Sequence, residues 1–115
     1  MSNLISLSLE NAATIAASAA FLLGAVINAS GHKAVKEQFV RYGFPSWWCW
    51  ITAILEFITA CLLIVRPTFA IGAVLGAVIM IAAIIAIIRV RDFRHILPPA
   101  VFLLLVIAAS VQFLS

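Results

Sequence analysis

Charged side chains are scarce in this sequence, and their scarcity tells which solvent surrounds the chain. Only 10% of the 115 residues are charged, whereas 66% are hydrophobic. A soluble domain has roughly a quarter of its residues charged and about half of them apolar. A soluble chain of this length could not hide so much apolar surface in one core. The composition therefore excludes an ordinary soluble domain and indicates a protein that is surrounded by lipid.

Long uncharged runs mark the segments that would cross a membrane. Residues 12–29, 68–88 and 96–115 contain no charge, and residues 47–65 contain only Glu56. A spanning helix needs about 20 mostly apolar residues, and a backbone in hydrocarbon must form its hydrogen bonds within its own segment. The runs are continuous rather than alternating, which excludes a membrane β-barrel. We predict an all-α integral membrane bundle of four transmembrane helices. This single domain, residues 1–115, has helices at about 9–30, 47–65, 68–88 and 97–114.

Paired cysteines, metal-ligand clusters and glycine-rich nucleotide loops are also missing. Cys49 and Cys61 lie twelve residues apart on one predicted helix, which is about 18 Å along its axis. A disulfide bond between them is therefore excluded, and two buried, inert thiols are expected. The two histidines are far apart and lack an accompanying carboxylate pattern, so no metal site is predicted. The sequence leaves any cofactor unidentified and indicates no nucleic-acid partner.

Basic residues are distributed unevenly between the two ends of the predicted helices. Three lie between the first and second helices and three between the third and fourth, whereas Arg66 alone lies between the second and third. Basic loops favour the cytoplasmic side of a membrane. We therefore predict a multi-pass protein of the bacterial inner membrane whose two termini lie outside. The residues that define its cytoplasmic side are Lys33, Lys36, Arg41, Arg89, Arg91 and Arg94.

The most polar segment, residues 31–46, has the pattern of an amphipathic connector between the first two helices. Gly43 and Pro45 interrupt this connector before the second helix begins. Trp47 and Trp50 follow, and indole rings favour the membrane interface, where their N–H groups stay hydrated. We expect these two tryptophans to anchor the helix at the interface or to line the mouth of a site.

Glu56 is the one charged residue in the middle of a predicted span, since Glu10 lies at the very start of the first predicted helix. It lies nine residues beyond Trp47, about 13 Å along the helix axis and close to the middle of a bilayer. An ionised carboxylate that faced lipid there would cost on the order of a few kcal/mol. Its side chain is therefore expected to face the interior and either to find a polar partner or to stay protonated. The predicted interior cluster consists of Asn28, His32, Lys33 and Glu56, with Thr52 and Thr59 on the same helix face as Glu56.

Three roles are open for this cluster. It could lock the helices in register, contact a ligand, or perform acid–base catalysis in which Glu56 moves the proton and Asn28 or His32 orients it. The packing partner of Gly72 and Gly76 is also open. Their G-x-x-x-G spacing marks a close-packing face, but the partner helix could belong to the same chain or to a second copy in a homo-oligomer.

Several short motifs resemble the DoxX-like family of small four-helix membrane proteins. They are Gly31 and Lys33 after the first helix, Phe39, the Gly43-x-Pro45 break, Glu56, the proline after the second helix, and a small-residue third helix with Met80. The resemblance covers about residues 24–86 and implies a four-helix membrane fold in which Lys33 and Glu56 are important. It implies no single activity, because relatives include a subunit of a thiosulfate:quinone oxidoreductase, membrane partners in oxidative-stress complexes, and chaperones for receptor assembly.

Two functions fit these observations. The first is a membrane protein that binds a lipophilic small molecule or a membrane partner through the polar cluster around Glu56. The alternative is an intramembrane enzyme, such as an isomerase, a cyclase or a quinone-linked oxidoreductase, with Glu56 as acid or base for a hydrophobic substrate. An apolar cavity with Glu56 in its wall would support the enzyme, whereas a carboxyl sealed between helices would exclude it.

Overall fold

The structure is a computed structural model that describes residues 12–114 of the chain. Its long helices are α1 (Ala12–Ala29), α3 (Trp48–Ile64), α4 (Phe69–Arg89) and α5 (Leu97–Leu114). A shorter helix, α2 (Lys33–Arg41), follows α1. The predicted all-helical fold is confirmed. The predicted start of the first helix, at residue 9, lies outside the described residues.

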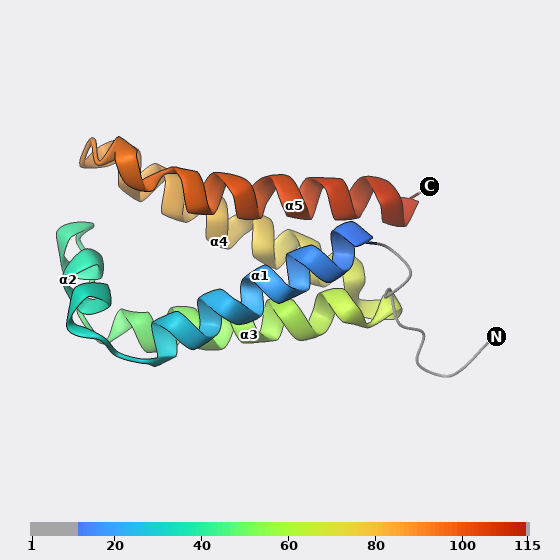
Figure 1. Ribbon diagram of the computed structural model, residues 1–115, viewed down its shortest axis with the longest axis horizontal. Coiled ribbons are helices and arrows are strands. Elements are labelled where there is room, and N and C mark those ends of the chain that lie inside the picture. The colour runs from blue at the N-terminus through green and yellow to red at the C-terminus, as the bar shows by residue number, and fades with distance from the viewer. Residues whose placement is uncertain (1–11, 115) are drawn as a thin grey trace.

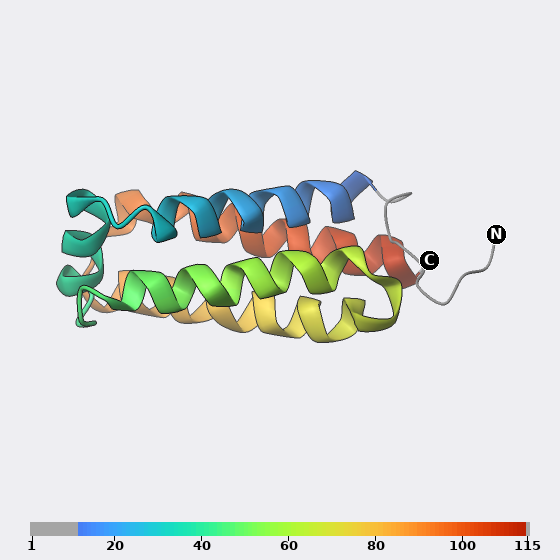
Figure 2. The ribbon, with the colours of Figure 1, turned by 90° about the horizontal axis from the view of Figure 1, so that it is seen from below.

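The long helices lie side by side in an elongated bundle (Figures 1 and 2). Each of them packs against two others, in the order α1, α3, α4, α5 and back to α1. The bundle is 48 Å long and 23 × 17 Å across. Figure 1 shows α2 across one end of the bundle, whereas the start of α1 and the end of α5 lie at the opposite end. This arrangement leaves α2 as a cap over one end of the interior.

The outside of the bundle is apolar. Leu23, Val74 and Leu104 are each more than half exposed, and such a surface is unfavourable in water but favourable among acyl chains. Among the described residues, α1, α5 and the segment Arg66–Arg89 have the length and apolar composition needed to cross a membrane. The remaining long helix, α3, is apolar but has 17 residues. The chain is therefore a helical membrane protein.

The predicted close-packing face of Gly72 and Gly76 is buried within the chain. A Cβ atom at Gly72 would lie 2.8 Å from the Cβ atom of Leu62 on α3. A Cβ atom at Gly76 would lie 2.9 Å from Cζ of Phe21 and 3.0 Å from Cγ2 of Thr59. The two glycines therefore allow α4 to approach α3 and α1 closely. The alternative in which this face joins two copies of the chain is wrong, because helices of the same chain already cover it.

The two free cysteines have different surroundings. Cys49 is buried, as expected, whereas Cys61 is exposed on the outer side of α3. Twelve residues rotate a helix by about 120°, so two thiols at this spacing do not both face the interior. The prediction of a buried thiol is therefore wrong for Cys61.

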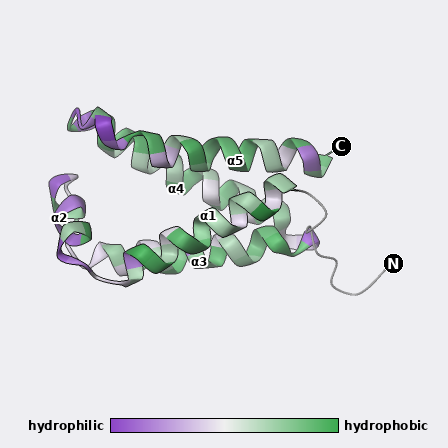
Figure 3. Ribbon diagram, viewed as in Figure 1, coloured by the Kyte–Doolittle hydropathy of each residue, from purple (hydrophilic) through white to green (hydrophobic). Residues whose placement is uncertain are grey.

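Polar side chains gather at the end of the bundle that α2 covers. Figure 3 shows hydrophilic residues in α2 and in the connection between α4 and α5, which contains the short 3-10 helix η2 (Phe93–His95). The opposite end carries the 3-10 helix η1 (Arg66–Thr68), where α3 turns into α4. The basic residues expected on one side of the membrane lie at the α2 end: Lys33, Lys36, Arg41, Arg89, Arg91 and Arg94.

Candidate functional site

The carboxyl group of Glu56 is buried between α3 and α1. Glu56 is only 4% exposed, and Nδ2 of Asn28 donates a hydrogen bond of 2.7 Å to its Oε1 atom. Asn28 lies in the last turn of α1 and Glu56 near the middle of α3. The two helices run in opposite directions and pack closely, which brings the two side chains together. The predicted association of Asn28 with Glu56 is thus present as a direct hydrogen bond.

Gly24 makes the room that this carboxyl group occupies. A Cβ atom at Gly24 would lie 2.8 Å from Oε2 and 3.2 Å from Oε1 of Glu56. Gly24 precedes Asn28 by one helical turn, so the two residues lie on the same face of α1. One turn of α1 therefore provides the space for Glu56 and the next turn provides its hydrogen-bond donor.

A cavity of about 510 Å³ lies beside this carboxyl group. All four long helices contribute to its walls, and α2 lies at its end, with Gln38 and Phe39 in the lining. Glu56, Asn28 and Thr52 supply polar atoms, whereas most of the wall is aliphatic. This volume lies within the range of small-ligand sites, roughly 300–1,000 Å³. Glu56 thus belongs to the wall of an apolar cavity, while its carboxyl group packs against Gly24 and Asn28 of α1.

Aromatic rings form much of the wall near α2. The ring of Phe44 stacks on that of Trp48, with centroids 6.0 Å apart and an angle of 9° between the planes. Phe39 meets Phe44 edge to face at 6.4 Å. Tyr42, after α2, and Phe102, on α5, also line the cavity. The rings come from segments far apart in the sequence, so only the folded bundle brings them together.

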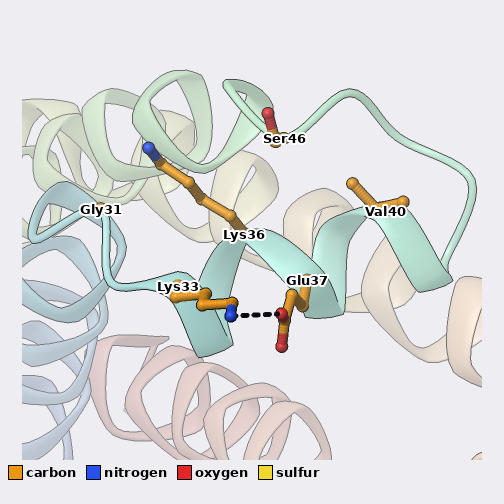
Figure 4. Close-up of a pocket in the computed structure, with 6 residues that line it drawn as sticks. All are labelled: Gly31, Lys33, Lys36, Glu37, Val40 and Ser46. Atoms are coloured by element: carbon orange, nitrogen blue, oxygen red, sulfur yellow. Dashed lines mark ion pairs between the residues drawn. The ribbon is translucent and has the colours of Figure 1, made fainter.

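Lys33 does not join Glu56, so the predicted interior position of this lysine is wrong. Its side chain is 90% exposed, and its Nζ atom lies 3.9 Å from Oε2 of Glu37, one turn further along α2. Figure 4 shows this ion pair in a separate surface pocket of about 490 Å³. Lys33 is the first residue of α2, where a carboxylate four residues ahead is closer than one inside the bundle.

His32 is also outside the cluster that the sequence predicted. It is exposed and is the residue before α2, where its backbone N–H donates to Oγ of Ser30 at 3.3 Å. Asn28 is followed by a turn at Gly31, whose φ angle is +66°. This turn leads the chain out of the bundle before His32, and His32 is not part of the cavity wall.

The other predicted site residues have separate positions. Trp47 and Trp50 are about half exposed. The Nε1–H group of Trp50 donates to the carbonyl of Ala29 at 3.2 Å, and Nζ of Lys36 lies 4.6 Å from its ring centroid. Neither tryptophan lines the cavity, whereas Trp48 between them does. Thr52 lies in the wall.

Thr59 has a packing role. It is fully buried, and its hydroxyl group donates to the backbone carbonyl of Leu55 at 2.8 Å. Its methyl group lies against Gly76. Thr59 therefore fills the α3–α4 contact and is not part of the cavity wall.

A second polar cluster, centred on Asp92, was not predicted from the sequence. Oδ2 of Asp92 accepts hydrogen bonds from Nη1 of Arg41 at 2.9 Å and from the hydroxyl of Tyr42 at 3.0 Å. It also lies 2.8 Å from Nδ1 of His95. Nε of Arg94 lies 3.6 Å from Oδ1. The Asp92 cluster therefore ties the end of α2 to the connection between α4 and α5.

The groups of the Asp92 cluster have shifted proton affinities. The hydrogen bond with His95, with further bonds from Tyr42 and Arg41, lowers the pKa of Asp92 from 3.8 to about 2. Burial raises the pKa of the Tyr42 hydroxyl, although Gln38, whose Nε2 lies 3.4 Å away, acts in the opposite direction. Asp92 is therefore ionised at neutral pH and holds α2 across the end of the cavity. No group of three or more His, Cys, Asp or Glu side chains that could hold a metal ion occurs within residues 12–114.

Comparison with known proteins adds one match. A model of the DoxX-like family matches residues 12–109, which include all of α1 to α4 and most of α5. Neither a curated protein nor a solved structure matches the chain.

Proposed function

Because this chain belongs to the DoxX-like family, we propose that it is a membrane protein that binds a lipophilic small molecule in the cavity beside Glu56. One observation carries the proposal: Glu56, which among residues 12–114 has the only carboxyl group in the apolar part of the bundle, lines a cavity large enough for a small ligand. A group that served only to lock two helices together would need no space beside it. An intramembrane acid is by default a candidate functional group.

The proposal includes four membrane spans. The helix α3 has 17 residues and contains Glu56, and it packs between α1 and α4 over its length. A helix enclosed by two spanning neighbours crosses with them, and a short span is accommodated by interfacial residues such as Trp47 and Trp50. We place the α2 end at the cytoplasmic side of a bacterial inner membrane, since six basic residues lie there and Arg66 alone lies at the other end.

Ligand access to the cavity agrees with this membrane placement. Most of the wall consists of aliphatic and aromatic side chains from helices whose outer faces are exposed and apolar. A molecule dissolved in the acyl chains would lose little solvation by entering such a cavity. The polar groups Asn28 and Glu56 would then select among apolar molecules by their hydrogen-bonding groups.

An intramembrane enzyme is the second candidate, and one contact favours it. The hydrogen bond from Asn28 holds Glu56 in a fixed position at the cavity wall, which suits an acid or base that exchanges a proton with a bound apolar substrate. Isomerisation or cyclisation needs such a proton transfer. Because His32 lies outside the cavity, Glu56 would have to act with Asn28 alone.

The experiment for binding uses the neutral fluorophore N-phenyl-1-naphthylamine and protein in phosphatidylcholine nanodiscs. Energy transfer from tryptophan to the fluorophore should saturate, since Trp48 lies in the cavity wall. Ala83→Phe places a ring in the cavity wall on α4 and should abolish the saturable signal. Ala70→Phe, on the exposed side of the same helix, is the matched control and should leave it unchanged.

Two results would overturn this proposal. One is the absence of a saturable signal in folded wild-type protein. The other is an equal loss in Ala83→Phe and Ala70→Phe. Glu56→Gln then separates the two candidates. The folded variant should keep binding the neutral probe in either case, but a reaction on a bound substrate that is lost in this variant would identify the protein as an enzyme.

A further inference from the structure

The charges around the cavity narrow the class of ligand, an inference that rests on the proposed function. We propose that the cavity binds a lipophilic organic cation, either a quaternary ammonium or a protonated amine, with its charge against the Glu56 carboxyl group. The surroundings of Glu56, the aromatic wall and the distribution of basic residues at the α2 end support this ligand class.

The carboxyl group of Glu56 has no cationic partner among the described residues. No lysine, arginine or histidine lines the cavity, and the only other titratable group in its wall is the hydroxyl of Tyr42. The helices α1, α4 and α5, which face Glu56 across the cavity, contribute no titratable side chain to the wall. An ionised Glu56 would therefore have no counterion from the described part of the chain.

Nearby basic side chains are engaged elsewhere. Lys33 pairs with Glu37 on the surface of α2, as Figure 4 shows. Lys36 lies over the ring of Trp50 at 4.6 Å, and Arg41 donates to Asp92 at 2.9 Å. Since a buried carboxylate is strongly stabilised by a paired cation, a cationic ligand would supply what the chain does not.

The hydrogen bond from Asn28 uses only one of the two carboxyl oxygens. The neutral amide of Asn28 donates to Oε1. The other oxygen, Oε2, lies against the backbone of α1 at Gly24, where an added Cβ atom would be 2.8 Å away. Because Glu56 also lines the cavity, we place the charged group of the ligand on the cavity side of the carboxyl group, with the Asn28 contact retained.

The aromatic wall suits the apolar body and the charge of a cation. The stacked rings of Phe44 and Trp48, the edge of Phe39, and the rings of Tyr42 and Phe102 surround the cavity between Glu56 and α2. The face of an aromatic ring attracts a cation within about 6 Å of its centroid, and aromatic cages recognise quaternary ammonium groups. A carboxyl group together with several aromatic rings is a binding set for a cation rather than for an anion.

The basic surface at the α2 end favours a ligand of the opposite charge, an anion. Its six basic residues would attract an anion to that end of the protein. An anion inside the cavity would then face Glu56 with no basic group in the wall, and like charges there repel. The interior and the surface thus favour ligands of opposite sign, and a matched pair of probes distinguishes them.

Cation binding has a definite proton balance. When Glu56 is protonated in the empty cavity, binding of the cation forms a carboxylate–cation pair and releases one proton to water. Binding should therefore weaken as the pH falls, because protonation removes the negative charge that the cation needs. Tyr42 keeps its proton at neutral pH, since burial raises its pKa above the usual value of 10.0.

The test uses tetraphenylphosphonium and tetraphenylborate, a cation and an anion of nearly the same size and shape, with protein in phosphatidylcholine nanodiscs. The wild-type protein should bind the cation saturably and the anion no better than empty nanodiscs do. Glu56→Gln should weaken cation binding by about tenfold or more. Glu37→Gln, the same substitution at an exposed carboxylate of α2, should change it by less than about twofold.

The outcomes separate this inference from the proposed function. If the neutral fluorophore binds but the cation binds no better than the anion, the ligand class is wrong and the binding function stands. The inference is also wrong if Glu56→Gln and Glu37→Gln weaken cation binding equally. If no probe binds saturably, both proposals fail. Should Glu56→Gln not yield folded protein, the comparison of the two probes on the wild type decides alone.

Discussion

The side-chain amide of Asn28 lies 2.7 Å from Oε1 of Glu56 and joins α1 to α3 inside the bundle. This contact fixes a carboxyl group at the wall of an apolar cavity, where one of its oxygens faces Gly24. The contact accounts for how a chain with so few charges keeps an acid inside an apolar helix bundle. It also defines where a ligand would meet a polar group.

Asn28→Leu should destabilise the folded protein by about 1–3 kcal/mol, because the buried carboxyl group loses its hydrogen-bond donor. The measurement is the thermal unfolding of purified protein in detergent. The double variant Asn28→Leu with Glu56→Leu should recover most of this loss, since no buried polar group is then left without a partner. Equal stability of the single variant and the wild type would contradict the prediction.

Gly24→Ala should also lower stability, by about 1–3 kcal/mol, because its methyl group would lie 2.8 Å from Oε2 of Glu56. The same substitution made together with Glu56→Ala should cost much less, because the smaller side chain leaves space. Unfolding measurements on the four proteins give the coupling between the two sites. If the stability changes of Gly24→Ala and Glu56→Ala are additive, the close approach of the two residues does not affect stability, which would contradict the prediction.

The Asp92 cluster should hold α2 in place at neutral pH and release it in acid. Its carboxyl has a pKa of about 2 in the folded protein, below its ordinary 3.8. The stabilisation is therefore fully present above about pH 4 and is lost as the pH falls through the folded value. The protection factors of the α2 amides, which correct the exchange rates for their intrinsic pH dependence, should therefore fall over this range in the wild type.

In Asp92→Asn the α2 amides should exchange faster already at neutral pH and show a much smaller acid response. The sequence contains no second aspartate, so Glu37→Gln, at an exposed carboxylate of α2 itself, serves as the control. If Asp92→Asn leaves the exchange of α2 unchanged at neutral pH, the Asp92 cluster does not hold this helix.

The charge distribution predicts which end of the bundle faces the cytoplasm. In a protein whose two cysteines are replaced by serine, Val40→Cys on α2 should react with a membrane-impermeant maleimide only after the inner membrane is opened. Leu114→Cys, at the other end, should react in intact spheroplasts. Both positions are more than half exposed. The reverse labelling pattern would overturn the orientation.

The helical fold follows from the sequence because a long apolar segment in lipid must form its backbone hydrogen bonds internally, and a helix does so. Uncharged runs of spanning length require helices, and the segment 31–46, expected as an amphipathic connector, contains the short helix α2. Asn28 and Glu56 could be placed together from their depths on adjacent antiparallel helices. These inferences depend on local pattern and helix geometry alone.

The rest of the site depends on how α2 folds back over the bundle. The turn at Gly31 carries His32 and Lys33 outward, and Glu37 offers Lys33 a nearer partner. Arg41 and Asp92 are 51 residues apart, and no spacing in the sequence links them. The cavity itself is set by the packing of side chains from five helices, which periodicity does not resolve.

The most direct test of the account is an experimental structure of the protein in a lipid nanodisc, without added ligand and then with tetraphenylphosphonium. The account predicts an open cavity beside Glu56 and Trp48, with non-protein density against the carboxyl group when the cation is present. A cavity closed by repacked helices, with Glu56 sealed between α1 and α3 and no density beside it in either structure, would contradict it.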